Sequence, residues 1–182
     1  KEMIRSMVID VLQGQKQDIA SSRPVKQVSR VQVEPGVFDT VDEAIRAAKE
    51  AQLRFEDCTL ATREKVIADI RAAMRPRVQE LAQKTVEETG MGRVADKVLK
   101  LNLTLDKTPG VEDLITECET GDNGMTLYEL SAYGVIGAIT PSTNPAETLI
   151  CNSIGMLAAG NAIFFSVHPG AKNLSRELVS EL

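Results

Sequence analysis

Two short polar segments near the end of the 182-residue chain carry side chains that could bind or stabilise an anionic group. They are Thr140, Pro141, Ser142, Thr143 and Asn144 in the first segment, and Ser166, His168 and Pro169 in the second. Hydroxyl and amide groups donate hydrogen bonds, and such donors stabilise an oxygen that gains negative charge during a reaction. These residues are therefore the candidate functional residues of the chain.

The elements around these segments predict how they are positioned. GVIGAIT (134–140) and AIFFSV (162–167) are short, apolar and β-branched, which predicts strands, the first covered on both faces. The helix between them is marked by Asn144 as N-cap, Pro145 at its first position, Glu147 three residues after the cap, and Gly160 near its end. A strand–helix–strand unit predicts parallel pairing through a right-handed crossover, and ligands of such sheets bind at the carboxyl ends of the strands.

The remaining helices and strands are predicted from the spacing of apolar residues and from the positions of proline and glycine. Helices are expected from Thr40 with a capping box to Glu43, from about Thr62 with an interruption at Pro76 and an end at Gly90, and from Val94 to just before Pro109. CETGDNGMTLYEL (118–130) predicts two extended runs around a tight turn, and AKNLSRELVSEL (171–182) an amphipathic helix. No residue signals a stop for that last helix, so we expect the chain to be part of a longer protein.

Several residues that could do chemistry are weaker candidates. Cys151 lies among apolar residues of the predicted helix and is expected to be buried and unreactive. Cys58 and Cys118 have no nearby histidine, and the wide spacing of the three cysteines fits neither a disulfide framework nor a metal site. Glu87 and Glu88 are expected at a solvated helix end. The segment 134–137 lacks the spacing of a dinucleotide fingerprint.

Composition excludes some classes of protein. The net charge is −5, acids and bases are interspersed, and aromatic residues are few, which argues against a nucleic-acid-binding protein. No apolar run approaches the roughly 20 residues of a membrane span, and the polar first residues carry no secretory signal. A reduced, cytoplasmic protein is expected.

Several segments in order resemble one family. They are VFDTVDEAIRAAKEAQ (37–52), ETGMGRVADK (88–97), TPGVEDL (108–114), TGDNGMTL (120–127) and the two polar segments with their strands. Together they resemble the N-terminal portion of CoA-acylating aldehyde dehydrogenases of bacterial microcompartments, which act in ethanolamine and propanediol utilisation. The resemblance implies an α/β, aldehyde dehydrogenase-like fold in which N-terminal helices lead into a doubly wound, Rossmann-like parallel sheet, here truncated within the domain.

The resemblance also implies an activity and site roles. A short aliphatic aldehyde, CoA and NAD would give acyl-CoA and NADH, with the nucleophilic cysteine beyond Leu182. In the wider superfamily the first segment reads Pro-Trp-Asn-Phe-Pro, and aligning its prolines puts Thr143, not Asn144, on the oxyanion-side position. Asn144 is left open as a pure helix cap or a cap that also contacts the active site. Thr140 to Thr143, Ser166, His168 and Pro169 would border the cofactor, and no metal is expected.

The domain organisation that follows has five parts. Residues 1–12 would be an amphipathic helix that binds shell proteins, 13–35 a linker, and 36–114 the helical part of the cofactor-binding domain. Residues 115–131 would form an oligomerisation arm of a homo-oligomer, and 132–182 the first strands and helices of the sheet. The expected location is the microcompartment lumen. For residues 1–12 the alternative is a terminal helix that packs on its own domain or is frayed, and for the whole chain it is a non-catalytic shell-docking module.

Overall fold

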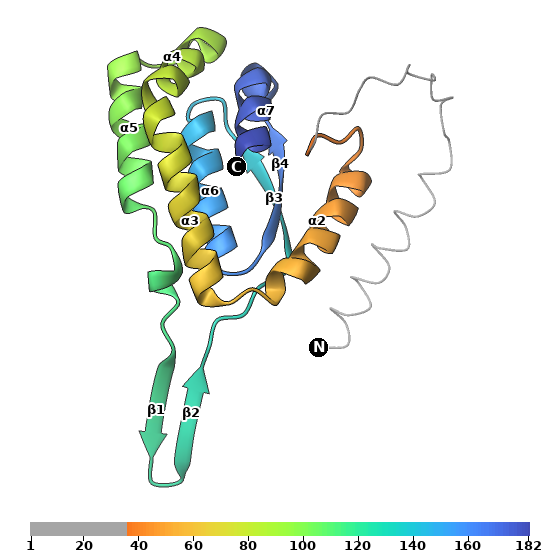
Figure 1. Ribbon diagram of the computed structural model, residues 1–182, viewed down its shortest axis with the longest axis vertical. Helices are drawn as coiled ribbons and strands as arrows, with labels where there is room; N and C mark the ends of the chain where they lie inside the picture. Colours follow the sequence, from red (N-terminus) through yellow and green to blue (C-terminus); the bar gives the residue numbers. More distant parts are fainter. Residues whose placement is uncertain (1–35) are drawn as a thin grey trace, which may run out of the picture. The chain divides into compact units, whose positions relative to one another are not determined.

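The computed structural model describes residues 36–182, which form six α-helices, a parallel pair of strands and a separate hairpin (Figure 1). The helices are α2 (Val41–Glu56), α3 (Leu60–Met74), α4 (Val78–Thr89), α5 (Val94–Lys107), α6 (Pro145–Ala158) and α7 (Lys172–Glu181). The strands are β1 (Glu117–Gly121), β2 (Gly124–Tyr128), β3 (Val135–Thr140) and β4 (Ala162–Val167), and short 3-10 helices occupy Arg75–Arg77, Val111–Asp113 and Pro169–Ala171. The predictions for residues 1–12 and 13–35 lie outside the described part of the chain.

Local sequence signals explain most helix boundaries. The Thr40 hydroxyl accepts a hydrogen bond from the Glu43 N–H, and the Glu43 carboxylate accepts one from the Thr40 N–H, so the predicted capping box is confirmed. α3 begins two residues before the expected Thr62 because the Thr59 hydroxyl caps it. Pro76 interrupts the chain between α3 and α4, and α4 ends at Gly90 in the left-handed conformation, both as expected.

β3 and β4 pair in parallel, as predicted, with α6 as the connection between them. α6 packs on both strands, and α3, α4 and α5 pack on α6, whereas α2 contacts the strands from the other side (Figure 1). The prediction that β3 is covered on both faces is wrong among the described residues. Ala138 and Thr140 are buried, but Ile139 between them is 87% exposed, since alternate side chains of a strand point to opposite faces and α2 does not reach this one.

The carboxyl end of α6 is closed by local hydrogen bonds. Gly160 has a φ of 81°, and its N–H donates to the Leu157 carbonyl at 3.0 Å while the Asn161 N–H donates to the Met156 carbonyl at 2.9 Å. These two bonds are the Schellman pattern that satisfies the last carbonyls of a helix. The buried Asn161 side chain also accepts from the Tyr133 and Gly134 N–H groups at 2.7 and 3.0 Å, and donates to the Met156 carbonyl. It therefore ties the start of β3 to the end of α6.

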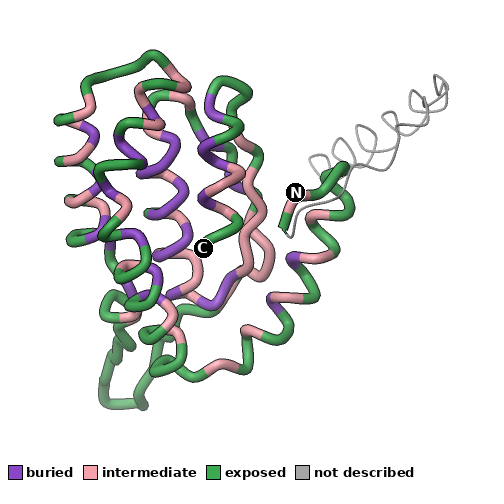
Figure 2. The backbone as a smooth tube through the Cα atoms, turned by 45° about the horizontal axis from the view of Figure 1, so that its top comes forward, coloured by how far each residue is buried: buried purple, intermediate pink, exposed green. Residues whose placement is uncertain are grey.

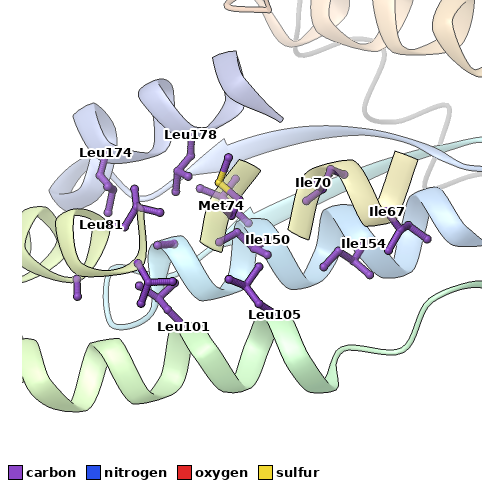
Figure 3. Close-up of a cluster of buried hydrophobic side chains, with 14 of the residues drawn as sticks. Ile67, Ile70, Met74, Leu81, Leu101, Leu105, Ile150, Ile154, Leu174 and Leu178 are labelled. Carbon is purple, nitrogen blue, oxygen red and sulfur yellow. The ribbon is translucent and has the colours of Figure 1, made fainter. Parts of the chain in front are cut away.

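The hydrophobic core lies between the helices (Figures 2 and 3). Its largest fully buried side chains come from five helices and include Met74, Leu81, Leu101, Leu105, Leu149, Ile150, Ile154, Leu174 and Leu178. Truncating one such side chain to alanine costs about 2–5 kcal/mol in other cores. The apolar periodicity that predicts α3, α5 and α7 agrees with the packing, since apolar side chains of all three helices face this core.

α4 and α7 are joined by charged side chains. The Glu88 carboxylate accepts hydrogen bonds from the Asn173 and Leu174 N–H groups, both at 2.8 Å, and so caps the amino end of α7. The prediction of a solvated helix end is confirmed for the exposed Glu87 but wrong for Glu88, which is half-buried and whose two carboxylate oxygens bind N–H groups of α7. A second cluster consists of Arg77, Glu80, Lys84, Glu177 and Glu181, with Lys84 Nζ at 2.7 Å from Glu177 Oε1.

The hairpin of β1 and β2 has the predicted strands and turn. Its antiparallel register runs from Glu117 paired with Tyr128 to Gly121 paired with Gly124. Every residue of both strands is exposed, and the hairpin extends away from the helices (Figure 1). Nothing within the described chain therefore covers its apolar side chains.

Candidate functional site

The two polar segments lie at one edge of the parallel pair, because Thr140 is in register with Val167. Thr140 is 2% exposed, and its hydroxyl oxygen has no hydrogen-bond partner among residues 36–182. Pro141, Thr143, Ser166, His168 and Pro169 are exposed, and Ser142 and Asn144 are half-buried. The predicted carboxyl-end arrangement of the two segments is thus confirmed by the register.

Asn144 stands at the N-cap position of α6, but its side chain makes no capping hydrogen bond. Its Oδ1 instead accepts from Lys97 Nζ and Lys100 Nζ, each at 3.2 Å. The predicted position of Asn144 as N-cap is therefore confirmed, as is Pro145 at the start of the helix, but the expected side-chain capping hydrogen bond is absent. Hydrogen bonds from charged donors are stronger than those from backbone N–H groups, and two ammonium groups from α5 are within reach of this oxygen.

Lys97 of α5 makes most of the polar contacts at the amino end of α6, and its side chain is only 5% exposed. Its Nζ donates to the Thr143 carbonyl and to Asn144 Oδ1, and lies 3.5 Å from Glu147 Oε1. Glu147 is also buried, and neither of its carboxylate oxygens accepts a hydrogen bond from the described residues. A buried ion pair of this kind needs both partners, because removing one leaves an uncompensated charge.

Sequence reasoning missed Lys97, Lys100 and Glu147 as site residues. One signal was available: Lys97 falls on the same helical face as Val94, Leu101 and Leu105, whose side chains turn toward the core. A lysine in an apolar stripe is rarely buried unless it is paired, so its position indicates a specific partner. The identity of that partner, 50 residues further along the chain, depends on the tertiary packing of α5 on α6.

A surface depression of about 520 Å³ lies over these groups. It is lined by Met91, Gly92, Arg93, Asp96, Lys97, Lys100, Thr143 and Asn144. Arg93 donates to Asp96 at 2.7 Å, and that hydrogen bond raises the pKa of the Arg93 guanidinium. The lining thus has three cations, Arg93, Lys97 and Lys100, and one carboxylate, Asp96. This positive charge at the amino end of α6 suits an anionic group such as a phosphate or a developing oxyanion.

Not all predicted site residues lie in this depression. Thr143 and Asn144 line it, whereas Thr140, Pro141, Ser142, Ser166, His168 and Pro169 do not. The His168 Nδ1 accepts the Gly170 N–H at 3.0 Å and closes the turn after β4. The structure thus unites the first polar segment with lysines of α5, and leaves the second segment exposed at the end of β4.

The cysteines lie outside the depression. Cys118 and Cys151 are exposed, Cys58 is half-buried, and all three are free thiols. The prediction that Cys151 is buried is wrong: Leu149, Ile150 and Ile154 of α6 face the core, and Cys151 projects from the opposite side. Among residues 36–182 no cluster of histidine, cysteine and acidic side chains is placed to hold a metal ion, and no helix there could span a bilayer.

Comparison with known proteins gives consistent matches. Residues 11–178 match the description "Aldehyde dehydrogenase family". The chain is 54% identical over 145 residues to a propanal dehydrogenase (CoA-propanoylating) of Salmonella typhimurium, covering 80% of this chain and 31% of that protein. The chain thus spans about a third of the length of this relative.

Solved structures agree with this match. Propionaldehyde dehydrogenase of Rhodopseudomonas palustris with bound propionyl-CoA has a TM-score of 0.78 at 49% identity, covering 81% of this chain and 33% of that one. A propionaldehyde dehydrogenase from the Clostridium phytofermentans fucose utilisation bacterial microcompartment has 0.77 at 51%, covering 81% and 35%. An engineered glycolyl-CoA reductase with bound NADP+ has 0.77 at 47%, covering 82% and 34%.

Proposed function

Since this chain belongs to the aldehyde dehydrogenase family, we propose that it forms the N-terminal part of a CoA-acylating enzyme that converts a short aliphatic aldehyde, CoA and NAD to acyl-CoA and NADH. The observation that carries this proposal is the 54% identity to a CoA-propanoylating dehydrogenase. The positive depression at the carboxyl end of β3 supports it, because an aldehyde that is attacked by a thiolate acquires an anionic oxygen.

The proposal gives the site residues two roles, and Thr143 has both of them. Thr143 and Asn144 lie on the oxyanion side, where preorganised donors stabilise the oxygen of the tetrahedral intermediate. Thr140, Pro141, Ser142, Thr143, Ser166, His168 and Pro169 border the nucleotide. NAD, when bound, supplies the hydride acceptor, and CoA the thiol that takes the acyl group. Cys58, Cys118 and Cys151 do not line the depression, so we assign the nucleophile to none of them.

The domain assignment is also part of the proposal. Residues 36–114 and 132–182 would belong to the cofactor-binding domain, with β3 and β4 as strands of a larger doubly wound sheet. The exposed hairpin within 115–131 would bridge subunits of a homo-oligomer, which fits the exposure of its apolar side chains. Residues 1–12 would bind shell proteins in a bacterial microcompartment, and the related enzyme from a fucose utilisation microcompartment supports this location.

A chimera tests whether the chain supplies what the proposal requires. This chain replaces the matching segment of the Salmonella propanal dehydrogenase, and NADH formation from propanal is followed with and without CoA. We expect CoA-dependent NADH formation and propanoyl-CoA as the product. Release of free propanoate, or no turnover by a folded chimera, would contradict the proposal, and binding of shell proteins without turnover would favour the docking module.

Substitutions in the same chimera separate the assigned roles. Asn144→Ala and Thr143→Ala should lower kcat, and the loss of one oxyanion donor costs about 3 kcal/mol in other enzymes. His168→Ala should raise KM for NAD or CoA and change kcat little, since it removes binding common to substrate and transition state. The isolated 182-residue chain should form no NADH. Comparing NAD with NADP in the chimera decides the nucleotide.

A further inference from the structure

The side-chain oxygen of Asn144, at the amino end of α6, accepts hydrogen bonds from two lysines. Lys97 Nζ and Lys100 Nζ both lie 3.2 Å from Asn144 Oδ1. Ammonium groups only donate hydrogen bonds, so the amide oxygen, and not the nitrogen, must face them. The Nδ2 group then points away from the lysines, and it makes no hydrogen bond within the part of the chain that the structure describes. The two lysines thus fix which end of this amide remains free.

The two lysines are anchored differently. The Lys100 side chain is exposed and within residues 36–182 donates only to Asn144, whereas Lys97 is 4% exposed and also binds the Thr143 carbonyl and the Glu147 carboxylate. The partners of Lys97 therefore include the residue before the N-cap, the N-cap and the first turn of α6. A side chain held on three sides in this way cannot change its rotamer without breaking several polar contacts in a buried setting.

We propose that Lys97 is a positioning residue, which holds the Thr143–Asn144 turn so that the Asn144 Nδ2 hydrogens stay available to an anionic oxygen in the depression. The Glu147 carboxylate compensates the buried positive charge of Lys97 and holds its ammonium group in place through the ion pair. The amino end of α6 lies beside that oxygen position, and its first N–H groups have no carbonyl partners within the helix. The consequence for catalysis rests on the proposed function, but the geometry of the turn does not.

The test uses the 182-residue chain and a variant that removes both buried charges. Lys97→Met alone would leave Glu147 uncompensated and could unfold the chain, so Lys97→Met/Glu147→Gln keeps the shape without a buried charge. The Asn144 side-chain amide is followed by NMR, and hydrogen exchange is measured for the N–H groups of residues 146–148. Lys100→Met is the matched control, because it removes the exposed lysine from the same oxygen.

In the double variant we expect the Asn144 amide signals to shift and the amide protons of the first turn of α6 to exchange at least about tenfold faster. Lys100→Met should move the side-chain signals and leave exchange nearly unchanged. Unchanged Asn144 signals and exchange in a folded double variant would overturn the proposal. An equal effect of the two substitutions would also overturn it, because Lys97 would then have no special role.

A kinetic arm connects the turn to the reaction. In the chimera, the double variant should lower kcat by about 10- to 100-fold while KM for NAD and for CoA stays within about twofold. A rise in KM with unchanged kcat would overturn the positioning role in catalysis. If the unsubstituted chimera does not oxidise propanal, the proposed function fails, and the NMR measurement still decides whether Lys97 holds the turn.

Discussion

The two ends of α6 are satisfied by different chemistry. At the carboxyl end, neutral hydrogen bonds from Gly160 and Asn161 occupy the last carbonyls, and Asn161 has partners for both ends of its amide. At the amino end, a buried lysine and glutamate face each other, and the side-chain oxygens of Glu147 and Thr140 have no hydrogen-bond partner within residues 36–182. Three unsatisfied side-chain oxygens thus lie at the amino end of α6, whereas beside its carboxyl end Arg63 Nε is the one such atom within residues 36–182.

This difference indicates how the helix divides its tasks. Buried polar groups without partners cost stability, so a fold retains them where they serve binding or chemistry. Beside the carboxyl end only Arg63 Nε is such an atom within residues 36–182, and the neighbouring hydrogen bonds suit an anchor for β3 and β4. The amino end combines unsatisfied groups, a positive depression and a free amide donor, which suits a ligand. Substitutions at the two ends should therefore affect stability in different ways.

The largest effect is expected from Lys97→Met at the amino end. This change leaves the Glu147 carboxylate buried without its cation and should lower the free energy of unfolding by about 3–5 kcal/mol, measured by urea denaturation. Adding Glu147→Leu should recover most of the loss, because neither charge then remains buried. Additive losses in the double variant would show that the two side chains do not act as a pair.

A smaller loss is expected from Asn161→Ala at the carboxyl end. Two backbone N–H groups and the Met156 carbonyl lose a partner, which should cost about 2–3 kcal/mol by the same measurement. Asn102→Ala is the control, since its side chain donates only to the Val98 carbonyl at 3.0 Å and is half-buried. Equal losses for the two variants would contradict the anchoring role of Asn161.

Gly160→Ala should cost less again, about 1–2 kcal/mol, because an alanine must adopt a φ of 81°. An added Cβ would also lie 2.7 Å from the Arg63 guanidinium, whose flexible end can move aside. Gly90→Ala separates these causes, since Gly90 has a φ of 67° and open space around its Cβ position. In thermal melts, Gly160→Ala should lower the Tm more than Gly90→Ala, and the difference measures the displacement of Arg63. A smaller loss of Tm for Gly160→Ala than for Gly90→Ala would contradict this expectation.

The smallest effect should come from the charged cluster between α4 and α7, which is exposed at its edges. Hydrogen bonds from Lys84 and then Arg77 hold the pKa of Glu177 below its ordinary 4.5, and those from Arg77 and Lys84 lower the pKa of Glu80 to about 2. Carboxylates with lowered pKa values stabilise the fold above about pH 4.5 and lose this contribution as the pH falls toward 2.

A melting-temperature titration with Glu177→Gln measures this contribution. Between about pH 5 and about pH 2.5, the wild-type protein should lose slightly more stability than the variant, because exposed ion pairs contribute little. An identical acid response in the two proteins would mean that Glu177 contributes nothing through its charge. Comparing this result with the stability loss of Lys97→Met shows whether the buried ion pair at the amino end of α6 contributes more to stability than the exposed cluster does.

Much of the fold follows from local sequence signals. The capping box at Thr40, the break at Pro76, the left-handed ends at Gly90 and Gly160, and the parallel pairing of β3 with β4 were all predicted from residue types and spacing. Each depends on residues a few positions apart or on a connection of one helix. Such signals are complete in the sequence, so the structure adds little to them.

The site could be predicted only in part, since its key contacts are long-range. The position of Thr143 and Asn144 at the end of β3 was predictable, but the Asn144 oxygen faces lysines 47 and 44 residues away. Local rules favoured a helix cap, and tertiary packing overrode them. The prediction that Cys151 is buried was wrong for a related reason. Apolar neighbours in sequence do not determine which face of a helix a side chain occupies.

The cap that Glu88 places on α7 has a consequence for the order in which the chain folds. α7 has 10 residues, and a helix of this length is marginal in water without tertiary contacts. Its first N–H groups are satisfied by a carboxylate from α4, and its apolar face packs on α6 and α4. α7 therefore gains its stabilising partners only after those helices have formed. On a ribosome, where α4 and α6 emerge before α7, they would already be present for α7 to pack on when it appears.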